Sequence, residues 1–196
     1  MSTTPTEDAA LLAAFASAGD SHSPKAENTR RMAFRAVVER YQESVFRLSF
    51  HLTNNAEEAE DIAQETFVAA YGTLAKLRPG SSIEAWLTSI AVNRARDYLK
   101  SHRHAKTDLA APEDLPQLTD GELDPEEAAS AIQREKLLRE AIEHLPAAYR
   151  TVIVLRDIED KSYEEIRQIL PLPLTTLKMR VIRGRLLLRK YLEGRL

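Results

Sequence analysis

The chain has 196 residues, of which 43% are hydrophobic and 29% are charged, and its formal net charge at pH 7 is −3. This length suits one ordinary domain or two small ones, and no stretch approaches the length of apolar sequence that a membrane span needs. The chain has no cysteine, which excludes disulfides, a thiolate nucleophile and cysteine-ligated zinc. No secretory signal pattern opens the sequence, so we expect a cytoplasmic protein without membrane insertion.

The composition predicts an all-α fold. Aromatic residues make up 6% of the chain, with six glycines and nine prolines, whereas strand-rich proteins favour aromatic and β-branched residues. Charge is divided into blocks that are acidic over 48–75, basic over 93–106, acidic over 107–133 and basic over 173–196. One such block alone would be an ordinary solvated helix face. Four alternating blocks indicate separate partners on separate surfaces.

The first third of the chain contains a short apolar helix, predicted over 9–18, and a polar stretch over 19–30 that separates it from the helical sequence "MAFRAVVERYQESVFRLSFHLT". We interpret residues 1–33 as an N-terminal extension with a polar insert over 20–32. A small helical domain then follows over 34–104.

The stretch "TDLAAPEDLPQLTDGELDP" is rich in proline and acidic residues and has no helical period. Such composition favours a flexible acidic linker, which we place at 105–125. It separates the first domain from a second small helical domain over 126–196.

An acidic helix is predicted from Asn55, whose side chain can cap it, with Glu58 suited to the positive helix start. Its buried face combines small and aromatic residues: Ala59, Ala63, Phe67, Ala70 and Leu74. The opposite face is mainly acidic: Glu57, Glu58, Asp61, Glu65 and Val68, with Gln64 at the margin. Asp61 and Glu65 repel each other at one turn's spacing. A basic group outside this helix would relieve that repulsion.

A basic helix follows in "IEAWLTSIAVNRARDYLKSHRH", with Arg96, Lys100 and Arg103 along one side and Trp86 and Asn93 on another face. Cations suit phosphates, and rings and amides suit bases, so the pattern favours nucleic acid. For Trp86 itself, a core position is the stronger interpretation. His102 and His104 lack further ligands nearby, so no metal site is predicted.

Near the C-terminus, Ser162 and Glu165 form a capping-box pattern, and Pro171 ends the helix that they open. Pro173 blocks continuation, and Thr175 or Thr176 is expected to cap a second helix. The inward face of that helix holds Leu174, Leu177, Val181, Gly184 and Leu188, while its outward face is mainly basic. Two helices joined by a tight turn, with a basic second helix, predict a helix-turn-helix rather than a plain helical hairpin.

Five segments in this order resemble the extracytoplasmic-function (ECF) group of bacterial RNA polymerase sigma factors: "RYQESVFRLSFHLT", "AEEAEDIAQETFVAAY", "AWLTSIAVNRARDYLKSHRH", "LPAAYRTVIVLRDIEDKSYEEI" and "LKMRVIRGRLLLRKYL". The resemblance covers about 34–104 and 126–192. It implies two helical domains, sigma region 2 and sigma region 4, joined by a flexible linker. Such a protein directs core polymerase to specific promoters for transcription initiation. The sequence shows no acid/base pair, nucleophile set, phosphate-cradling glycine loop or metal cluster, so we expect neither an enzyme nor a cofactor.

The resemblance implies that region 2 binds the β′ clamp helices and melts the −10 element, and that region 4 binds the β flap and reads the −35 element. The polymerase-binding motif falls on Asp61, Gln64 and Glu65. With the basic pattern above, the −10 candidates are Trp86, Asn93, Arg94, Arg96, Lys100 and Arg103. The −35 candidates are Thr175, Thr176, Lys178, Met179, Arg180 and Arg183. Many members are held inactive by an anti-sigma factor, which is therefore a candidate partner.

The helix-turn-helix departs from the family pattern, which usually has Ala at Arg167, Gly at Pro171, Gly at Thr175 and Ser at Met179. Pro171 cannot adopt the positive φ of a glycine turn, so another turn geometry is expected. Two alternatives therefore stay open beside the promoter-specificity subunit. One is a stand-alone helix-turn-helix regulator, and the other is a sigma-like interaction module with altered DNA reading.

Overall fold

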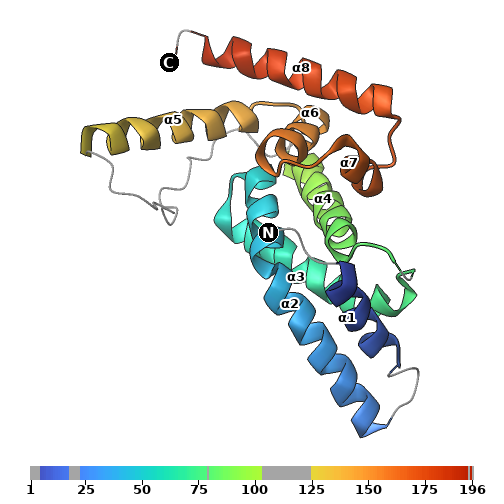
Figure 1. The fold of residues 1–196 in the computed structure, drawn as a ribbon. Helices are drawn as coiled ribbons and strands as arrows, with labels where there is room; N and C mark the ends of the chain where they lie inside the picture. Colours follow the sequence, from blue (N-terminus) through green and yellow to red (C-terminus); the bar gives the residue numbers. More distant parts are fainter. Residues whose placement is uncertain (1–4, 18–22, 79, 103–124, 194, 196) are drawn as a thin grey trace.

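The computed structural model describes residues 5–17, 23–78, 80–102, 125–193 and 195, and all regular secondary structure in these ranges is helical (Figure 1). The first unit contains α1 (Pro5–Ser17), α2 (Pro24–Thr53), α3 (Ala56–Thr73), a 3-10 turn (Leu74–Lys76) and α4 (Ile83–His102). The second contains α5 (Pro125–Glu143), α6 (Ala147–Ile153), a π-helical turn (Val154–Ile158), α7 (Tyr163–Ile169) and α8 (Leu174–Leu192). The all-α prediction is confirmed. The predicted linker lies outside the described residues except for Pro125, which begins α5.

In the first unit, α2 packs against α3, α4 and α1, and the core between them is apolar. Phe15 of α1 is fully buried and meets the ring of Tyr71 edge-on, with 5.9 Å between the ring centroids. Asp8, also buried, accepts a hydrogen bond of 2.6 Å from the Tyr41 hydroxyl. These contacts hold α1 on the bundle by both apolar and polar interactions.

The prediction of a polar separator before the second helix is wrong for the residues that the structure describes. Ser23 caps α2 by accepting a hydrogen bond from the backbone N–H of Ala26, and Pro24 occupies the first helical position. A serine cap followed by proline starts a helix efficiently, and polar residues without an internal breaker continue it. The helix then runs unbroken to Thr53, so the domain boundary placed between residues 33 and 34 falls inside α2.

The predicted start and buried face of α3 are confirmed. The Asn55 side chain accepts hydrogen bonds from the backbone N–H groups of Glu57 and Glu58, at 3.0 and 3.3 Å. Ala59, Ala63 and Ala70 are buried, as is Leu74 just beyond the helix, and Phe67 packs partly buried against the core. Small residues on this face let α3 lie close to α2 and α4, so its acidic side faces outward.

In the second unit, α7 and α8 form the predicted helix-turn-helix. Ser162 and Glu165 make the expected capping box, and α7 ends at Ile169 before Pro171. Leu170 is extended (φ −115°, ψ 119°), and Pro173 has φ −58° and ψ 144°. No residue in this turn has a positive φ. The turn is therefore built from extended and proline conformations, as the presence of Pro171 requires.

The prediction that Thr175 or Thr176 caps α8 is wrong. The residue before the helix is Pro173, whose carbonyl accepts the N–H of Leu177 at 3.0 Å, and no side chain caps this end. The fixed φ of proline suits the position before a first turn, so the helix begins earlier than the threonines. Leu177, Val181 and Gly184 are buried as predicted.

Gly184 marks a close approach of α8 to α6. A Cβ placed on this residue would lie 2.6 Å from Cγ1 of Ile153, which is itself buried. A separation that short forces the neighbouring side chain or the helix to move. Gly72 near the end of α3 offers the opposite case, because an added Cβ there meets no atom within 4 Å.

We expect Gly184→Ala to lower the free energy of unfolding by about 1–2 kcal/mol, because overpacking a buried contact costs more than the helix propensity that alanine gains. Gly72→Ala is the matched control and should raise stability by up to about 1 kcal/mol. Urea unfolding followed by circular dichroism measures both. Equal effects of the two substitutions would contradict the close packing of α6 and α8.

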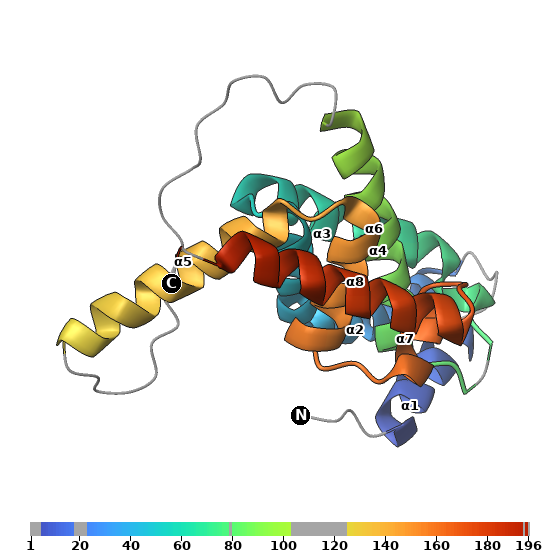
Figure 2. The same cartoon turned by 90° about the horizontal axis from the view of Figure 1, so that it is seen from above.

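The two units are docked onto each other, with α6 and α7 against α4 (Figure 1 and Figure 2). Arg150 of α6 is buried and donates a hydrogen bond of 2.8 Å to the carbonyl of Leu52 in α2. Glu159, whose side chain is 8% exposed, accepts a hydrogen bond from Nη2 of Arg47 at 3.0 Å and lies 3.2 Å from Nδ1 of His51. Polar groups, some of them buried, thus pair with one another across the contact between the units.

The environment of Glu159 controls its ionisation. Burial alone raises the pKa of this carboxyl, but the hydrogen bonds from His51 and Arg47 outweigh that effect and lower the pKa to about 2. The carboxylate is therefore charged and paired in the folded chain throughout the physiological range. The pKa of Glu159 is lower in the folded chain than in the unfolded chain. Its ionisation therefore adds fully to the free energy of unfolding when the pH is above the unfolded pKa. That contribution is lost as the pH falls through the folded pKa.

We expect Glu159→Gln to lower the free energy of unfolding by about 3 kcal/mol at neutral pH, on the scale of its pKa shift. The difference between the two proteins should shrink as the pH falls from 4.5, the ordinary value, towards about 2. Urea titrations at several pH values measure this, with Glu164→Gln, an exposed change on α7, as the control. A difference that does not depend on pH would contradict the ion pairing of Glu159.

Candidate functional site

The exposed acidic face of α3 carries the predicted polymerase-binding residues. Asp61, Gln64 and Glu65 are all exposed. Val68, one turn further on, is 75% exposed. Gln64 donates a hydrogen bond of 3.3 Å to Glu60 on the same helix. This face therefore combines negative charge with an uncovered apolar residue, a combination suited to a protein partner.

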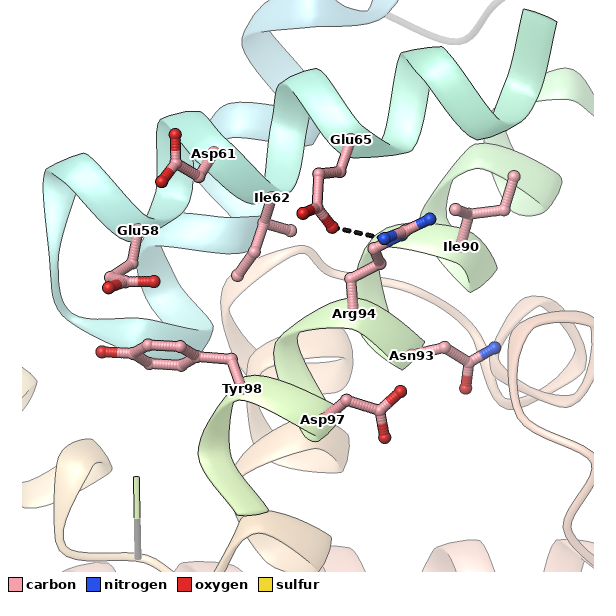
Figure 3. A pocket seen from close by; sticks show the side chains of 9 residues that line it. All are labelled: Glu58, Asp61, Ile62, Glu65, Ile90, Asn93, Arg94, Asp97 and Tyr98. Atoms are coloured by element: carbon pink, nitrogen blue, oxygen red, sulfur yellow. Dashed lines mark hydrogen bonds and ion pairs between the residues drawn. The ribbon is translucent and has the colours of Figure 1, made fainter. Parts of the chain in front are cut away.

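A groove of about 650 Å³ separates this face of α3 from α4 (Figure 3). Its lining is mainly acidic and apolar: Glu58, Asp61, Ile62, Glu65, Ile90, Asn93, Arg94, Asp97 and Tyr98. The structure thus brings two polymerase-binding candidates and two −10 candidates into one place. Arg94 of α4 donates a hydrogen bond to Glu65 of α3. Arg94 is thus a basic group outside α3 that relieves the repulsion at Glu65, as the sequence predicted for this face.

The other −10 candidates lie along α4. Trp86 is partly buried and packs against the core, which agrees with its interpretation as a core residue. Arg96 is partly buried, and Lys100 is exposed with Nζ 3.1 Å from Oδ1 of Asp97. Arg103 lies outside the described residues. The basic side of α4 is therefore continuous with the groove through Arg94 and Asn93.

The −35 candidates gather at the start of α8. Five of them line a cavity of about 430 Å³ together with two residues of α6: Ala148, Tyr149, Thr175, Thr176, Met179, Arg180 and Arg183. Met179 is 47% exposed, and Arg183 is also exposed. Lys178 does not line this cavity, because its Nζ lies 5.8 Å from the centre of the Tyr163 ring on α7. The outward face of α8 is therefore accessible along its first three turns.

The later turns of α8 carry exposed apolar side chains. Ile182, Leu186 and Leu187 are 59%, 63% and 38% exposed, and Leu138 of the neighbouring α5 is 43% exposed. We call these four residues the apolar stripe. Arg185, between them, is engaged with Asp157, with Nε 3.0 Å from Oδ2. Exposed apolar residues on two helices that contact each other favour a surface for another protein.

Some residues of these surfaces were missed by reasoning from the sequence. Tyr98 lies in the groove, and Ala148 and Tyr149 lie in the cavity beside α8. Tyr149 reaches this place because α6 packs against α8 at Gly184. Tyr149 and Gly184 are 35 positions apart in the sequence, so a local sequence pattern cannot predict their contact.

The part of the chain that the structure describes holds neither a metal-ligand cluster nor a membrane-spanning helix. No group of three or more histidine or acidic side chains is placed to hold a metal ion there. None of the described helices combines the length and apolar character needed to cross a bilayer.

Comparisons with known proteins agree with this architecture. The family description "Sigma-70 region 2" matches residues 37–105, and "Sigma-70, region 4" matches residues 135–188. The ECF RNA polymerase sigma factor SigW of Bacillus subtilis is 35% identical over 168 residues, which cover 82% of this chain and 89% of SigW. The RNA polymerase sigma-H factor of Pseudomonas aeruginosa is 30% identical over 169 residues, covering 83% and 88%.

The chain therefore belongs to the ECF group of RNA polymerase sigma factors. It acts in transcription initiation with core RNA polymerase and promoter DNA as its partners. The resemblance of the five sequence segments to this group is confirmed.

Solved structures support the same fold. CnrH in complex with the cytosolic domain of CnrY has a TM-score of 0.65 at 24% identity, covering 95% of this chain and 97% of that chain. RpoE of Bartonella quintana, solved in complex with the anti-sigma factor NepR, has a TM-score of 0.64 at 23% identity, covering 82% and 97%. At these identities the likeness concerns the fold alone.

Proposed function

We propose that the acidic face of α3 binds the β′ clamp helices of core polymerase through Asp61, Gln64 and Glu65. The observation that carries this assignment is the exposure of all three side chains beside Val68, on a helix whose other face is buried. Carboxylates one turn apart repel each other, and cations of a partner relieve that repulsion. The exposed Val68 offers an apolar contact beside these polar groups.

Across the groove, α4 handles the −10 element in this proposal. Asn93 supplies an amide for a base, and Arg94, Arg96, Lys100 and Arg103 supply charge for phosphates. Trp86 contributes through packing, because it is partly buried against the core. Phosphate contacts position the strand, and the amide contributes to sequence selection.

The first three turns of α8 read the −35 element. Arg180 and Arg183 reach phosphates or guanine edges, and Thr175, Thr176 and Lys178 contact the backbone around them. Met179 places an apolar side chain where the family usually has a serine, so it contacts a thymine methyl rather than donating a hydrogen bond.

The apolar stripe on α8 and α5 is the second polymerase contact, made with the β flap. On α8, Leu186 and Leu187 follow Arg183, the last of the −35 candidates, so these two leucines leave the −35 candidates free for DNA. An anti-sigma factor is a further proposed partner, since RpoE of Bartonella quintana was solved with one. Such a protein would inactivate the chain by covering surfaces that polymerase needs.

Binding to a randomised duplex pool tests the assignment against a stand-alone regulator. The free chain is expected to bind weakly and without selecting a sequence, because its net charge of −3 opposes phosphate approach. Holoenzyme assembled with core polymerase should select a common sequence, with an affinity that falls steeply as salt rises. Tight selection by the free chain would instead favour a regulator that works without polymerase, and the acidic face of α3 would then have no role.

A further inference from the structure

The ion pair between Glu65 and Arg94 joins two surfaces with different proposed partners. Glu65 belongs to the polymerase-binding face of α3, and Arg94 belongs to the −10 side of α4 (Figure 3). The pair lies at the mouth of the groove, where the two side chains are 59% and 39% exposed. Both groups are therefore accessible to a competing partner.

We propose that this ion pair couples polymerase binding to DNA binding. In the free chain, Glu65 holds Arg94 over the groove and away from DNA. A cationic side chain of the polymerase that binds Glu65 repels Arg94, which then becomes available to a phosphate of the −10 strand. The inference rests on the proposed function, because it needs Glu65 to contact polymerase and Arg94 to contact DNA.

The charges around the pair favour such an exchange. Arg94 is the sole cation among the residues that line the groove, against the carboxylates of Glu58, Asp61, Glu65 and Asp97. Asp97 is already engaged by Lys100. The surplus of negative charge retains Arg94 and opposes an approaching phosphate. Cations from a partner cancel that surplus and so remove both obstacles together.

The expected size of the coupling follows from the exposure of the pair. Exposed ion pairs change equilibria by a factor of about two to five, and salt reduces the effect. Coupling between two binding sites is reciprocal, so one factor describes the gain in DNA affinity and the gain in polymerase affinity. Measurements of the affinity for DNA and of the affinity for core polymerase therefore both give this coupling factor.

The first test measures DNA binding without polymerase. The probe is a fluorescein-labelled oligothymidylate of about 20 nucleotides, because phosphate attraction does not depend on sequence. At low salt, Glu65→Gln should bind it about two- to fivefold more tightly than the unaltered chain by fluorescence anisotropy. Adding Arg94→Gln should abolish that gain.

The chain offers a matched control in the exposed pair of Arg35 and Glu39 on α2, whose Nε and Oε1 lie 2.7 Å apart. Glu39→Gln removes the same charge and breaks the same kind of ion pair, away from the groove. It should raise DNA affinity less than Glu65→Gln. Equal gains from the two variants would overturn the proposal, because the effect would then come from net charge alone.

The second test measures affinity for core polymerase. Arg94→Gln should strengthen core binding by about two- to fivefold, since Glu65 no longer has to release a partner. Arg35→Gln is the control for the lost charge and should have a smaller effect. An Arg94→Gln variant that binds core no better than Arg35→Gln overturns the proposal.

A separate experiment shows whether the proposed function, rather than the coupling, is wrong. If reversing the charges of Asp61 and Glu65 leaves core binding intact, α3 is not the polymerase site and the coupling to polymerase is wrong. The DNA result with Glu65→Gln could still appear in that case. It would then report an internal restraint on Arg94 that polymerase does not relieve.

Discussion

Asp61→Lys combined with Glu65→Lys is expected to weaken binding to core polymerase at least about 100-fold, because the reversed charges face the cations that the acidic face attracts. Both side chains are exposed on α3, so the substitutions leave the buried face and the Asn55 cap untouched. A fluorescence titration against core polymerase measures the loss. Transcription that depends on the chain should fall in parallel.

Glu39→Lys with Glu43→Lys is the control for this loss, since both residues are exposed one turn apart on α2 and the charge change is the same. That variant should bind core nearly as well as the unaltered chain. Circular dichroism should show equal helicity for both double variants. Unchanged core affinity of the Asp61 and Glu65 variant would remove α3 from the polymerase interface.

If Arg183 pairs with a guanine edge, we expect Arg183→Ala to weaken the free energy of promoter binding by about 1–3 kcal/mol, measured with holoenzyme. In that case the selected −35 sequence should relax at one position. A phosphate contact would weaken binding to all sequences alike. Selection from a randomised −35 library in the presence of core polymerase separates these two outcomes. Arg185→Ala is the control on the same helix, because Arg185 is engaged with Asp157.

Met179→Ser should change the preferred −35 base, since it replaces an apolar side chain by a hydroxyl that can donate a hydrogen bond. Met179 lines the same cavity as Arg183 and is 47% exposed, so a base can reach it. If the Met179 and Arg183 variants both keep the original preference and activity, α8 does not read DNA. The chain would then be a sigma-like interaction module.

Local patterns were sufficient to predict much of the fold. The caps at Asn55 and Ser162 depend on residues three positions apart, and the faces of α3 and α8 depend on the helical period. The family resemblance located the candidate surfaces. Pro171 predicted that the turn would avoid positive φ, and the extended backbone at Leu170 agrees with that.

What the sequence did not reveal depends on contacts between distant segments. Arg94 and Glu65 are 29 positions apart, and Arg150 and Leu52 are 98 positions apart. Their pairing follows from how the helices pack, which helical periodicity does not encode. The start of α2 was missed for another reason: the serine–proline signal at residues 23 and 24 was outweighed by the polarity of the residues around it.

Transcription from fragmented genomic DNA of the bacterium that carries this gene, with its purified core polymerase, tests the central claim most directly. Sequencing of the transcripts should show start sites that need both the chain and core polymerase and that share one pair of −35 and −10 sequences. The Asp61→Lys, Glu65→Lys variant should lose these start sites. Core polymerase that starts at the same places with and without the chain would contradict its role as a promoter-specificity subunit.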